Sequence, residues 1–488
     1  MTAVTAQTNA DHESGVIERT VVVVRSWKAP IGLGVFSIIA IVLFVFLHRP
    51  GTTSFQLSAD DDPFRLPLIV SSPVFAIGLF VAAIVVIAVV VVLRRRRRST
   101  IFPVVVWGAL VIAFLALVAF GPSTVQADST VLPIVLTVVL VGLAVTSAVL
   151  VARTSKSPLW LTAVFAILML SAFLVWAAAG QGIVVPGLLV GAVSLSTPLI
   201  YGALGGVLTE RVGVVNVAIE GQLLGGAFLG IVVASLTRNP YLGLIAAPIA
   251  GVLVSFVLAA FSIKYFVDQV IVGVVLNVLV LGLTSFFYSQ VLSADPVHLN
   301  NQTVRLEHVN VPILSDIPII GPILFRQTIV VYLMYLAVVL AWFGLFRTRW
   351  GLRLRAVGEH PQAADTVGIN VNRTRFWNVA LAGAIAGLGG AYFTLGSVGL
   401  FGKDMTAGAG YIALAAVIFG RWDPIRATLA ALLFGFTENL QNVLSIARSP
   451  VPNEFMLMLP YLVTVFAVAG LVGKVRGPAA SGKPYMKS

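Results

Sequence analysis

Seven polar side chains stand inside long apolar runs, where they could bind a passing solute or satisfy one another. Two are acids and five are neutral: Glu220, Glu438, Asn216, Asn277, Thr406, Tyr411 and Asn439. An acid in an apolar run is costly to bury, and it usually faces a protein interior or a water path. These side chains are therefore candidates to line a translocation path, and equally candidates for hydrogen bonds between helices.

Asn216 and Glu220 are four residues apart, which predicts that they share one face of a helix. Because Gly221 follows, Glu220 could instead fix a helix break at that point. The first interpretation makes Glu220 a gate or pathway residue. The second makes it a structural acid that needs only hydrogen bonds.

The chain lacks the residue sets of many catalytic and cofactor sites. It has no Cys, none of its five histidines lies in the middle of an apolar run, and no HExxH-type pair occurs. Residues 477–483 read GPAASGK, the spacing of a phosphate-binding loop, but no Ser or Thr follows the lysine and no strand is predicted before it. We therefore predict no catalytic residue, no metal and no directly bound cofactor.

Composition predicts an all-α polytopic membrane protein. Hydrophobic residues make up 59% of the 488 residues and charged residues 10%, against about 25% charged residues in soluble domains. Apolar runs of helix length predict roughly 12–14 transmembrane helices. The expected spans are 31–47, 67–93, 101–120, 131–152, 159–178, 184–207, 213–236, 241–262, 268–293, 328–346, 375–399, 407–421, 425–445 and 454–473. The regions 184–236 and 407–445 are rich in Gly and have short connections, so broken or re-entrant helices are expected there.

The basic residues set the expected orientation. With both termini in the cytoplasm, most of the 31 Lys and Arg lie on the inner side, including Arg94 to Arg98. The net charge of +12 is therefore attributed to cytoplasmic loops facing lipid head groups, and no nucleic-acid partner is expected.

The longest polar stretch of the second half, Arg347 to Phe376, carries six arginines and falls on the inner side. Pro361 suits the first position of a helix and Gly368 suits its end, so one short helix is expected between them. Such a helix is too short to be stable alone. It is either part of a solvated loop or a docking element for a partner.

Three stretches resemble permease subunits of bacterial ABC importers. They are GGVLTERVGVVNVAIEGQ, GLRLRAVGEHPQAADTVGINV and AGAGYIALAAVIFGRWDP, in this order. The resemblance covers about residues 185–475, lies within the branched-chain amino acid and simple-sugar permease family, and is strongest to permeases of nucleoside importers.

The resemblance implies which residues couple transport to ATP hydrolysis. The coupling helix of such permeases corresponds to residues 358–368, which assigns an ATPase-coupling role to Gly358, Glu359, His360, Pro361, Ala363, Ala364, Asp365 and Gly368. His360 departs from the Asn that is common at that place. ATP and Mg²⁺ would be bound by a separate cytoplasmic ATPase, and the chain itself would not be an enzyme.

The resemblance also implies partners and a location. The partners would be that ATPase, a second permease of the same or homologous sequence, an extracytoplasmic substrate-binding protein and membrane lipid. The location would be the bacterial cytoplasmic (inner) membrane. Simple sugars or amino acids are the alternative substrates to nucleosides. A stand-alone secondary transporter is a weaker alternative, because few spans carry an ionisable residue.

These inferences predict four regions along the chain. Residues 1–30 form a cytoplasmic segment, 31–180 an extra N-terminal transmembrane region, 181–475 the permease core and 476–488 a cytoplasmic tail. The function of the extra N-terminal helices stays open.

Overall fold

The computed structural model describes residues 27–56, 124–154, 159–301, 304–317, 320–446, 454, 458 and 477–486. These residues belong to two compact units, one of residues 1–47 with 134–172 and one of residues 48–133 with 173–488. The predicted spans 67–93 and 101–120, and almost all of 454–473, lie outside the described residues.

The first unit is built from apolar helices. It contains α1 (Lys28–Ala40), which continues as π-helical turns over Ile41–Phe46, and most of α4 (Val131–Thr154) and α5 (Leu159–Ala177). The Ser37 hydroxyl on α1 donates to the Leu33 carbonyl at 2.8 Å and lies 3.5 Å from the Leu140 carbonyl on α4. Much of the outer apolar surface, such as Ile38 and Val138, is exposed, as suits helices in contact with lipid.

Two small sheets lie in the second unit. β1 (Thr52–Gln56) pairs antiparallel with β2 (Thr124–Asp128) and parallel with β3 (Gly182–Val184), with Phe55 opposite Val125 and Ile183. The Thr53 hydroxyl, fully buried, donates to the Val175 carbonyl at 2.9 Å. The second sheet pairs β4 (His308–Asn310) with β5 (Arg326–Thr328).

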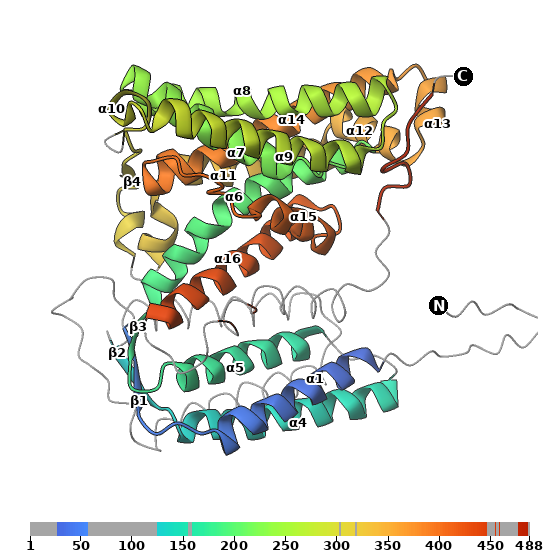
Figure 1. Ribbon diagram of the computed structural model, residues 1–488. Coiled ribbons are helices and arrows are strands. Elements are labelled where there is room, and N and C mark those ends of the chain that lie inside the picture. Colours follow the sequence, from blue (N-terminus) through green and yellow to red (C-terminus); the bar gives the residue numbers. More distant parts are fainter. Residues whose placement is uncertain are drawn as a thin grey trace, which may run out of the picture. The chain divides into compact units, whose positions relative to one another are not determined.

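Most helices of the second unit follow one another with short connections, and the longest connection is that between α10 and α11 (Figure 1). They are α6 (Val185–Arg211), α7 (Ile219–Thr237), α8 (Pro240–Ala259, extended by Ala260–Lys264), α9 (Gln269–Phe287, extended by Tyr288–Leu292), α10 (Pro296–Leu299), short turns at Leu314–Asp316 and Gly321–Phe325, α11 (Ile329–Arg347), α12 (Arg349–Glu359), α13 (Pro361–Thr366), α14 (Val371–Ala391, extended by Tyr392–Val398), α15 (Ala409–Phe419) and α16 (Pro424–Ile446). Among the described residues of both units, eight helices are long and apolar enough to cross a membrane. The prediction of an all-α polytopic membrane protein is thus confirmed.

Small residues let the central helices approach closely. α14 packs most extensively against α8 and α6, α7 packs against α8, and α16 packs against α6. At the crossing of α8 and α14, a Cβ on Gly251 would overlap the Gly383 carbonyl, and one on Gly383 would overlap the Ser255 side chain. Such backbone-to-backbone contact is typical of helix association in lipid, where packing rather than apolar burial holds helices together.

The helical structure is interrupted in both regions where broken helices were expected, 184–236 and 407–445. Residues 212–218, between α6 and α7, are not helical, yet Val212, Val214 and Ala218 are fully buried. α15 has only 11 residues, which gives it a length of about 16 Å and makes it too short for a whole span. Irregular backbone at such depth is tolerated only where protein or a water-lined cavity satisfies it.

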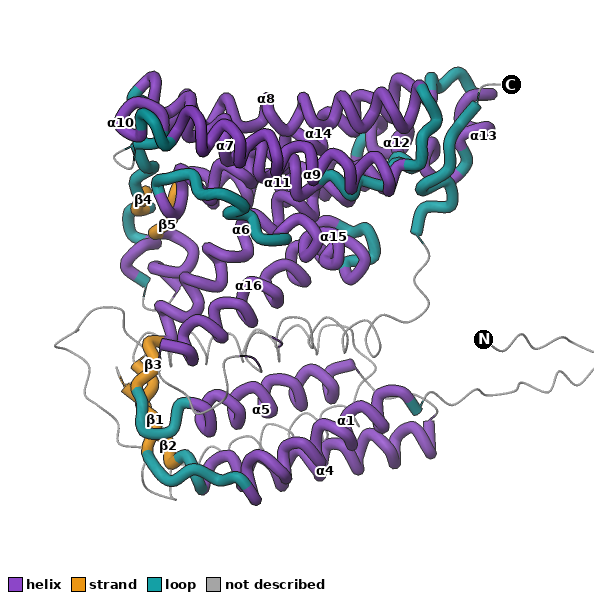
Figure 2. The backbone as a smooth tube through the Cα atoms, in the orientation of Figure 1, coloured by secondary structure: helices purple, strands orange, loops and turns teal. Residues whose placement is uncertain are grey.

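The ends of this bundle differ in character. Figure 1 places α12, α13 and the C-terminal segment at one end and α10 with β4 at the other. Figure 2 shows β4 and β5 side by side at that second end, and the C-terminal loop beside α13 at the first.

Candidate transport site and coupling element

Glu220 lies in the first turn of α7, and the residue is only 8% exposed. Its Oε1 accepts hydrogen bonds from the Thr406 hydroxyl at 2.5 Å and the Gly408 N–H at 2.9 Å. Its Oε2 accepts one from the Gly410 N–H at 2.6 Å. Glu220 therefore caps the start of α15, where the first N–H groups have no partner inside the helix and the helix dipole favours a negative charge.

Glycine shapes the loop that meets Glu220. Gly408 has a φ of +85°, in the left-handed region that side chains disfavour. At Gly410 a Cβ would overlap the backbone of Glu220. The loop can therefore come close enough for three donors to converge on one carboxylate.

Asn277 on α9 satisfies both sides of the break before α7. Its Oδ1 accepts from the Gly221 N–H at 2.8 Å, and its Nδ2 donates to the Val217 carbonyl at 2.8 Å. The same Nδ2 lies 3.0 Å from the Tyr411 hydroxyl on α15. One amide thus links α9, the start of α7 and α15.

The prediction that Asn216 and Glu220 share a helix face is wrong. α7 begins only at Ile219, so Asn216 lies in the non-helical segment, fully buried. Its amide exchanges hydrogen bonds with the Gln222 amide at 3.0 and 3.4 Å. The chain leaves the helix at Gly213, whose φ is +92°, and this side-chain pair then replaces helical hydrogen bonds.

Three residues of this region were missed from the sequence. Gln222 donates to the Ser255 hydroxyl at 2.8 Å, and the Gln269 Oε1 accepts from the Val215 N–H at 2.7 Å. All three side chains are at most 3% exposed. The sequence could have indicated them, because each is a polar residue in or beside an apolar run.

The candidates differ in their access to solvent. Asn216, Asn277 and Thr406 are 0–5% exposed and already hydrogen-bonded, whereas Tyr411 is 47% exposed. The network can thus hold the two helix starts in place, and Tyr411 is its most exposed member. We call Glu220, Asn277, Thr406 and Tyr411 the helix-start cluster.

The last two candidates lie on α16. Asn439 donates to the Leu188 carbonyl near the start of α6 at 2.7 Å, so it joins α16 to α6 rather than to the helix-start cluster. Glu438 is half-buried next to it. The set predicted as one path therefore occupies at least two places in the bundle.

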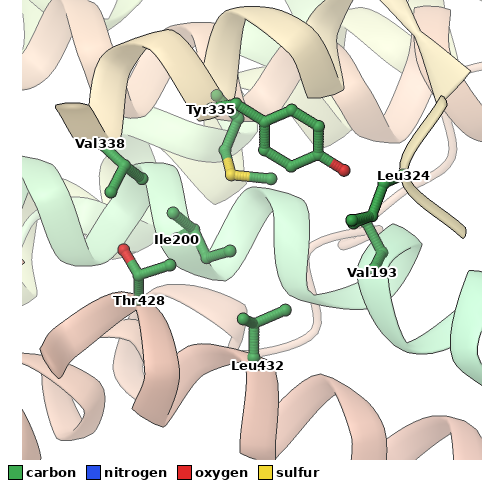
Figure 3. Close-up of a pocket in the computed structure, with 8 residues that line it drawn as sticks. Val193, Ile200, Leu324, Tyr335, Val338, Thr428 and Leu432 are labelled. Carbon is green, nitrogen blue, oxygen red and sulfur yellow. The ribbon is translucent and has the colours of Figure 1, made fainter. Parts of the chain in front are cut away.

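An apolar cavity of about 220 Å³ lies between α6, α11 and α16 (Figure 3). Its lining is Val193, Ile200, Leu324, Met334, Tyr335, Val338, Thr428 and Leu432. The Thr428 hydroxyl already donates to the Pro424 carbonyl, and the Tyr335 hydroxyl is buried without a hydrogen-bond partner. With so few free polar groups, the cavity offers little to orient a solute that carries several hydrogen-bonding groups.

We predict that replacing Asn277 with Leu destabilises the protein more than replacing it with Gln. Leucine leaves the buried Gly221 N–H unpaired, which costs about 1–3 kcal/mol. The thermal unfolding temperature in detergent should fall by several degrees for Asn277→Leu and by less for Asn277→Gln. Equal melting temperatures for both variants would contradict this role, and Asn372→Leu, at an exposed position on α14, is the control.

The polar stretch at the other site holds two helices rather than one. The predicted short helix is present as α13, Pro361–Thr366, and Gly368 with a φ of +86° ends it. Before it lies α12, which the sequence analysis missed. Thr348 caps α12 by accepting from the Gly351 N–H at 3.1 Å, and its buried residues Gly351, Leu354 and Val357 recur every three positions.

α13 has one buried and one exposed face. Ala364 is 3% exposed, whereas Gln362 and Ala363 are exposed and Val367 is 74% exposed. The helix therefore packs through Ala364 and offers its other side to a partner. Exposed arginines border it, among them Arg349, Arg353 and Arg373.

The coupling element, which we define as residues 349–368, packs directly on the end of α6. Gly358 touches the Arg211 backbone so closely that a Cβ there would overlap the Arg211 carbonyl oxygen. Arg211 in turn donates from Nε to the Trp422 carbonyl at 2.8 Å, and the Trp422 indole donates to Glu210. The turn between α15 and α16 is thereby attached to the same place.

Comparison with known proteins bears on both sites. A model of the branched-chain amino acid transport system permease component matches residues 188–468. The chain belongs to this family. The matched range holds both the helix-start cluster and the coupling element.

Several relatives that this permease matches are named as ABC transporter permeases. It is 41% identical to a guanosine ABC transporter permease, NupQ, of Bacillus subtilis over 320 residues, covering 62% of this chain and 97% of the relative. It is 40% identical to a nucleoside ABC transporter permease, NupC, of Lactococcus lactis, covering 60% and 94%. It is 38% identical to a putative glucose ABC transporter permease, TsgC13, of Haloferax volcanii, covering 54% and 80%.

The permease is thus a transport subunit of an ABC system rather than an enzyme, and ATP hydrolysis takes place in a separate subunit. Among the residues that the structure describes, no three His, Asp or Glu side chains gather as ligands of a metal would.

Proposed function

We propose that this permease forms the translocation path of an ABC importer for nucleosides. Its two most similar relatives above are a guanosine and a nucleoside permease, at 41% and 40% identity and over nearly their whole lengths. The half-exposed Tyr411, whose hydroxyl is held by Asn277, is the side chain we assign to contact a polar solute.

The coupling element would dock the ATPase. α13 is too short to stand alone, is held by one buried face, and keeps Gln362, Ala363 and Val367 free for a partner. In this role Glu359 and Asp365 supply negative charge within a basic surround. His360 precedes the helix and caps it without a side-chain hydrogen bond.

One continuous set of contacts would transmit the movement of the ATPase to the membrane-spanning helices. The proposed coupling role rests chiefly on these contacts. Gly358 touches Arg211, Arg211 holds Trp422, and Trp422 lies in the turn between α15 and α16. The other end of α15 is held by Glu220 at the start of α7. A push on α13 can thus shift α15, together with its Tyr411, against α7, which is the kind of rigid-body movement that alternating access needs.

The remaining parts of the importer follow from this role. A cytoplasmic ATPase would bind ATP with Mg²⁺, a second permease would complete the path, and an external binding protein would deliver the solute. The termini and the coupling element would face the cytoplasm of a bacterium, with the chain in the inner membrane. Residues 181–475 would be the core, 31–180 an additional transmembrane region and 476–488 a cytoplasmic tail.

A second candidate substrate class is simple sugars. The putative glucose permease of Haloferax volcanii is 38% identical, only slightly less than the nucleoside permeases. The helix-start cluster by itself does not favour a base over a sugar hydroxyl.

Uptake of labelled uridine and adenosine separates these candidates. Cells that carry the gene should accumulate label several times faster than cells that lack it, and excess ribose or leucine should not compete. Competition by ribose or glucose would select the sugar candidate. Unchanged uptake with the protein present in the membrane would contradict the nucleoside proposal.

A further inference from the structure

The C-terminal segment of the chain is packed against the coupling element. Residues 477–486 form a tight turn, with the Ser481 N–H donating to the Pro478 carbonyl at 3.0 Å and the Lys483 N–H to the Ala480 carbonyl at 3.2 Å. Gly482 has a φ of +76° within it. The segment lies beyond the range 188–468 that the family model matches, and none of the roles assigned above uses it.

This segment contacts both helices of the coupling element. The Ala480 N–H donates to the Gly358 carbonyl at the end of α12 at 2.9 Å. The Ala479 N–H lies 3.3 Å from the Glu359 Oε2. The Tyr485 phenol lies close to the Asp365 carboxylate of α13, and desolvation followed by that carboxylate raises the pKa of the phenol.

The same segment also contacts the permease core. The Arg375 guanidinium on α14 donates from Nη1 to the Lys483 carbonyl at 3.0 Å. Gly477 lies against the Trp422 ring, so that a Cβ there would be 3.1 Å from it. Ala480 and Tyr485 are only 5% and 8% exposed, which distinguishes the segment from a solvated tail.

Arg375 is the buried anchor of this arrangement. The residue is 2% exposed, and its Nε and Nη2 have no hydrogen-bond partner. A guanidinium with so few hydrogen bonds is costly to bury, because little offsets its lost hydration. A carbonyl that accepts a hydrogen bond from it lowers that cost. The carbonyl of Lys483 is such an acceptor, so Arg375 favours the position in which the segment lies on α14.

We propose that residues 477–486 are a strap that ties the coupling element to the permease core. With the strap in place, a displacement of α13 moves α12, the end of α6 and the Trp422 turn together. Without it, part of that displacement is absorbed by movement of α13 alone. The inference rests on the coupling role of α13 proposed above, but the strap's mechanical effect can be measured without any ATPase.

The first experiment measures the mobility of α13 itself. Because the chain has no Cys, a spin label on Gln362→Cys reports one exposed position of α13. We compare a chain that ends at Gly477, which loses every strap residue after the first, with a chain that ends at Met486, which keeps every contact described above. The label should become more mobile only in the shorter chain, and equal mobility in both would overturn the proposal.

The second experiment measures coupling in liposomes that hold the whole importer. Uptake of labelled uridine or adenosine per ATP hydrolysed should fall about threefold to tenfold in the chain that ends at Gly477. It should be unchanged in the chain that ends at Met486. If the shorter chain does not assemble, Tyr485→Phe and Arg375→Met replace it, and normal ratios in both would overturn the strap.

The outcomes separate the two proposals. If α13 is loosened by loss of the strap but no ATPase copurifies with the intact chain, the docking role fails and the strap stands. If the ATPase copurifies and uptake is normal while the label mobility does not change, the strap fails and the docking role stands. The shorter chain and Arg375→Met both remove the hydrogen bond between Arg375 and the Lys483 carbonyl. Combining them should therefore reduce coupling by less than the sum of their separate effects.

Discussion

Replacing Glu220 with Gln is expected to abolish most uptake, even though Gln keeps the size and shape of Glu. The carboxylate accepts from Thr406 and Gly408 on one oxygen and from Gly410 on the other. An amide has only one oxygen, so its NH₂ must face at least one of these buried N–H groups. Leaving a buried donor unpaired costs about 1–3 kcal/mol, and more when a charged acceptor is lost.

The measurement is uptake and thermal unfolding of Glu220→Gln beside Glu307→Gln, an exposed acid in a loop. The Glu220 variant should unfold at a lower temperature and transport at least tenfold more slowly, and the Glu307 variant should match the unaltered protein. Full activity of Glu220→Gln would show that the carboxylate does not hold α15 in the working protein.

A pathway acid and a structural acid at position 220 both predict a large effect of Gln. A structural acid does so because a cap with three converging donors needs both carboxylate oxygens. A pathway role has a separate sign, namely a raised KM for the solute in a variant whose unfolding temperature is unchanged, and Tyr411→Phe is the variant suited to test it.

Composition and run lengths were sufficient to predict a polytopic helical membrane protein, and glycine content located the broken helices. They could not give the partners of Glu220, because Thr406 lies 186 residues further along the chain and Gly410 lies 190. Such contacts depend on how helices pack, which no local pattern encodes. The supposed shared face of Asn216 and Glu220 failed for a related reason, since four-residue spacing has meaning only inside a helix.

Two other features were within reach of the sequence. α12 carries a Thr cap and buried residues at helical spacing, but its three arginines are also typical of a solvated loop. Residues 477–483 match the spacing of a phosphate-binding loop without its Ser or Thr. Their glycines have a structural role instead, because Gly482 allows the tight turn and Gly477 lets the strap lie against Trp422.

Replacing Gly358 with Ala is expected to reduce coupling more than adding a methyl group at any other position of the coupling element. The added Cβ would overlap the Arg211 carbonyl oxygen, a backbone atom that cannot turn aside. Alanine favours a helix over glycine by about 1 kcal/mol, so α12 itself will persist and must move away from α6. Such overpacking costs about 1–3 kcal/mol, and it falls at the contact through which α13 acts on Arg211 and Trp422.

The expected result is a permease that inserts and binds its ATPase, hydrolyses ATP, and imports about tenfold less solute per ATP, a loss that corresponds to about 1.4 kcal/mol. The control is Gly282→Ala on α9, where a Cβ meets nothing within 4 Å. If Gly358→Ala imported at the normal ratio, the contact with Arg211 could not be the route of coupling. The connection would then have to run through the strap and Arg375, and the chain that ends at Gly477 would become the decisive variant.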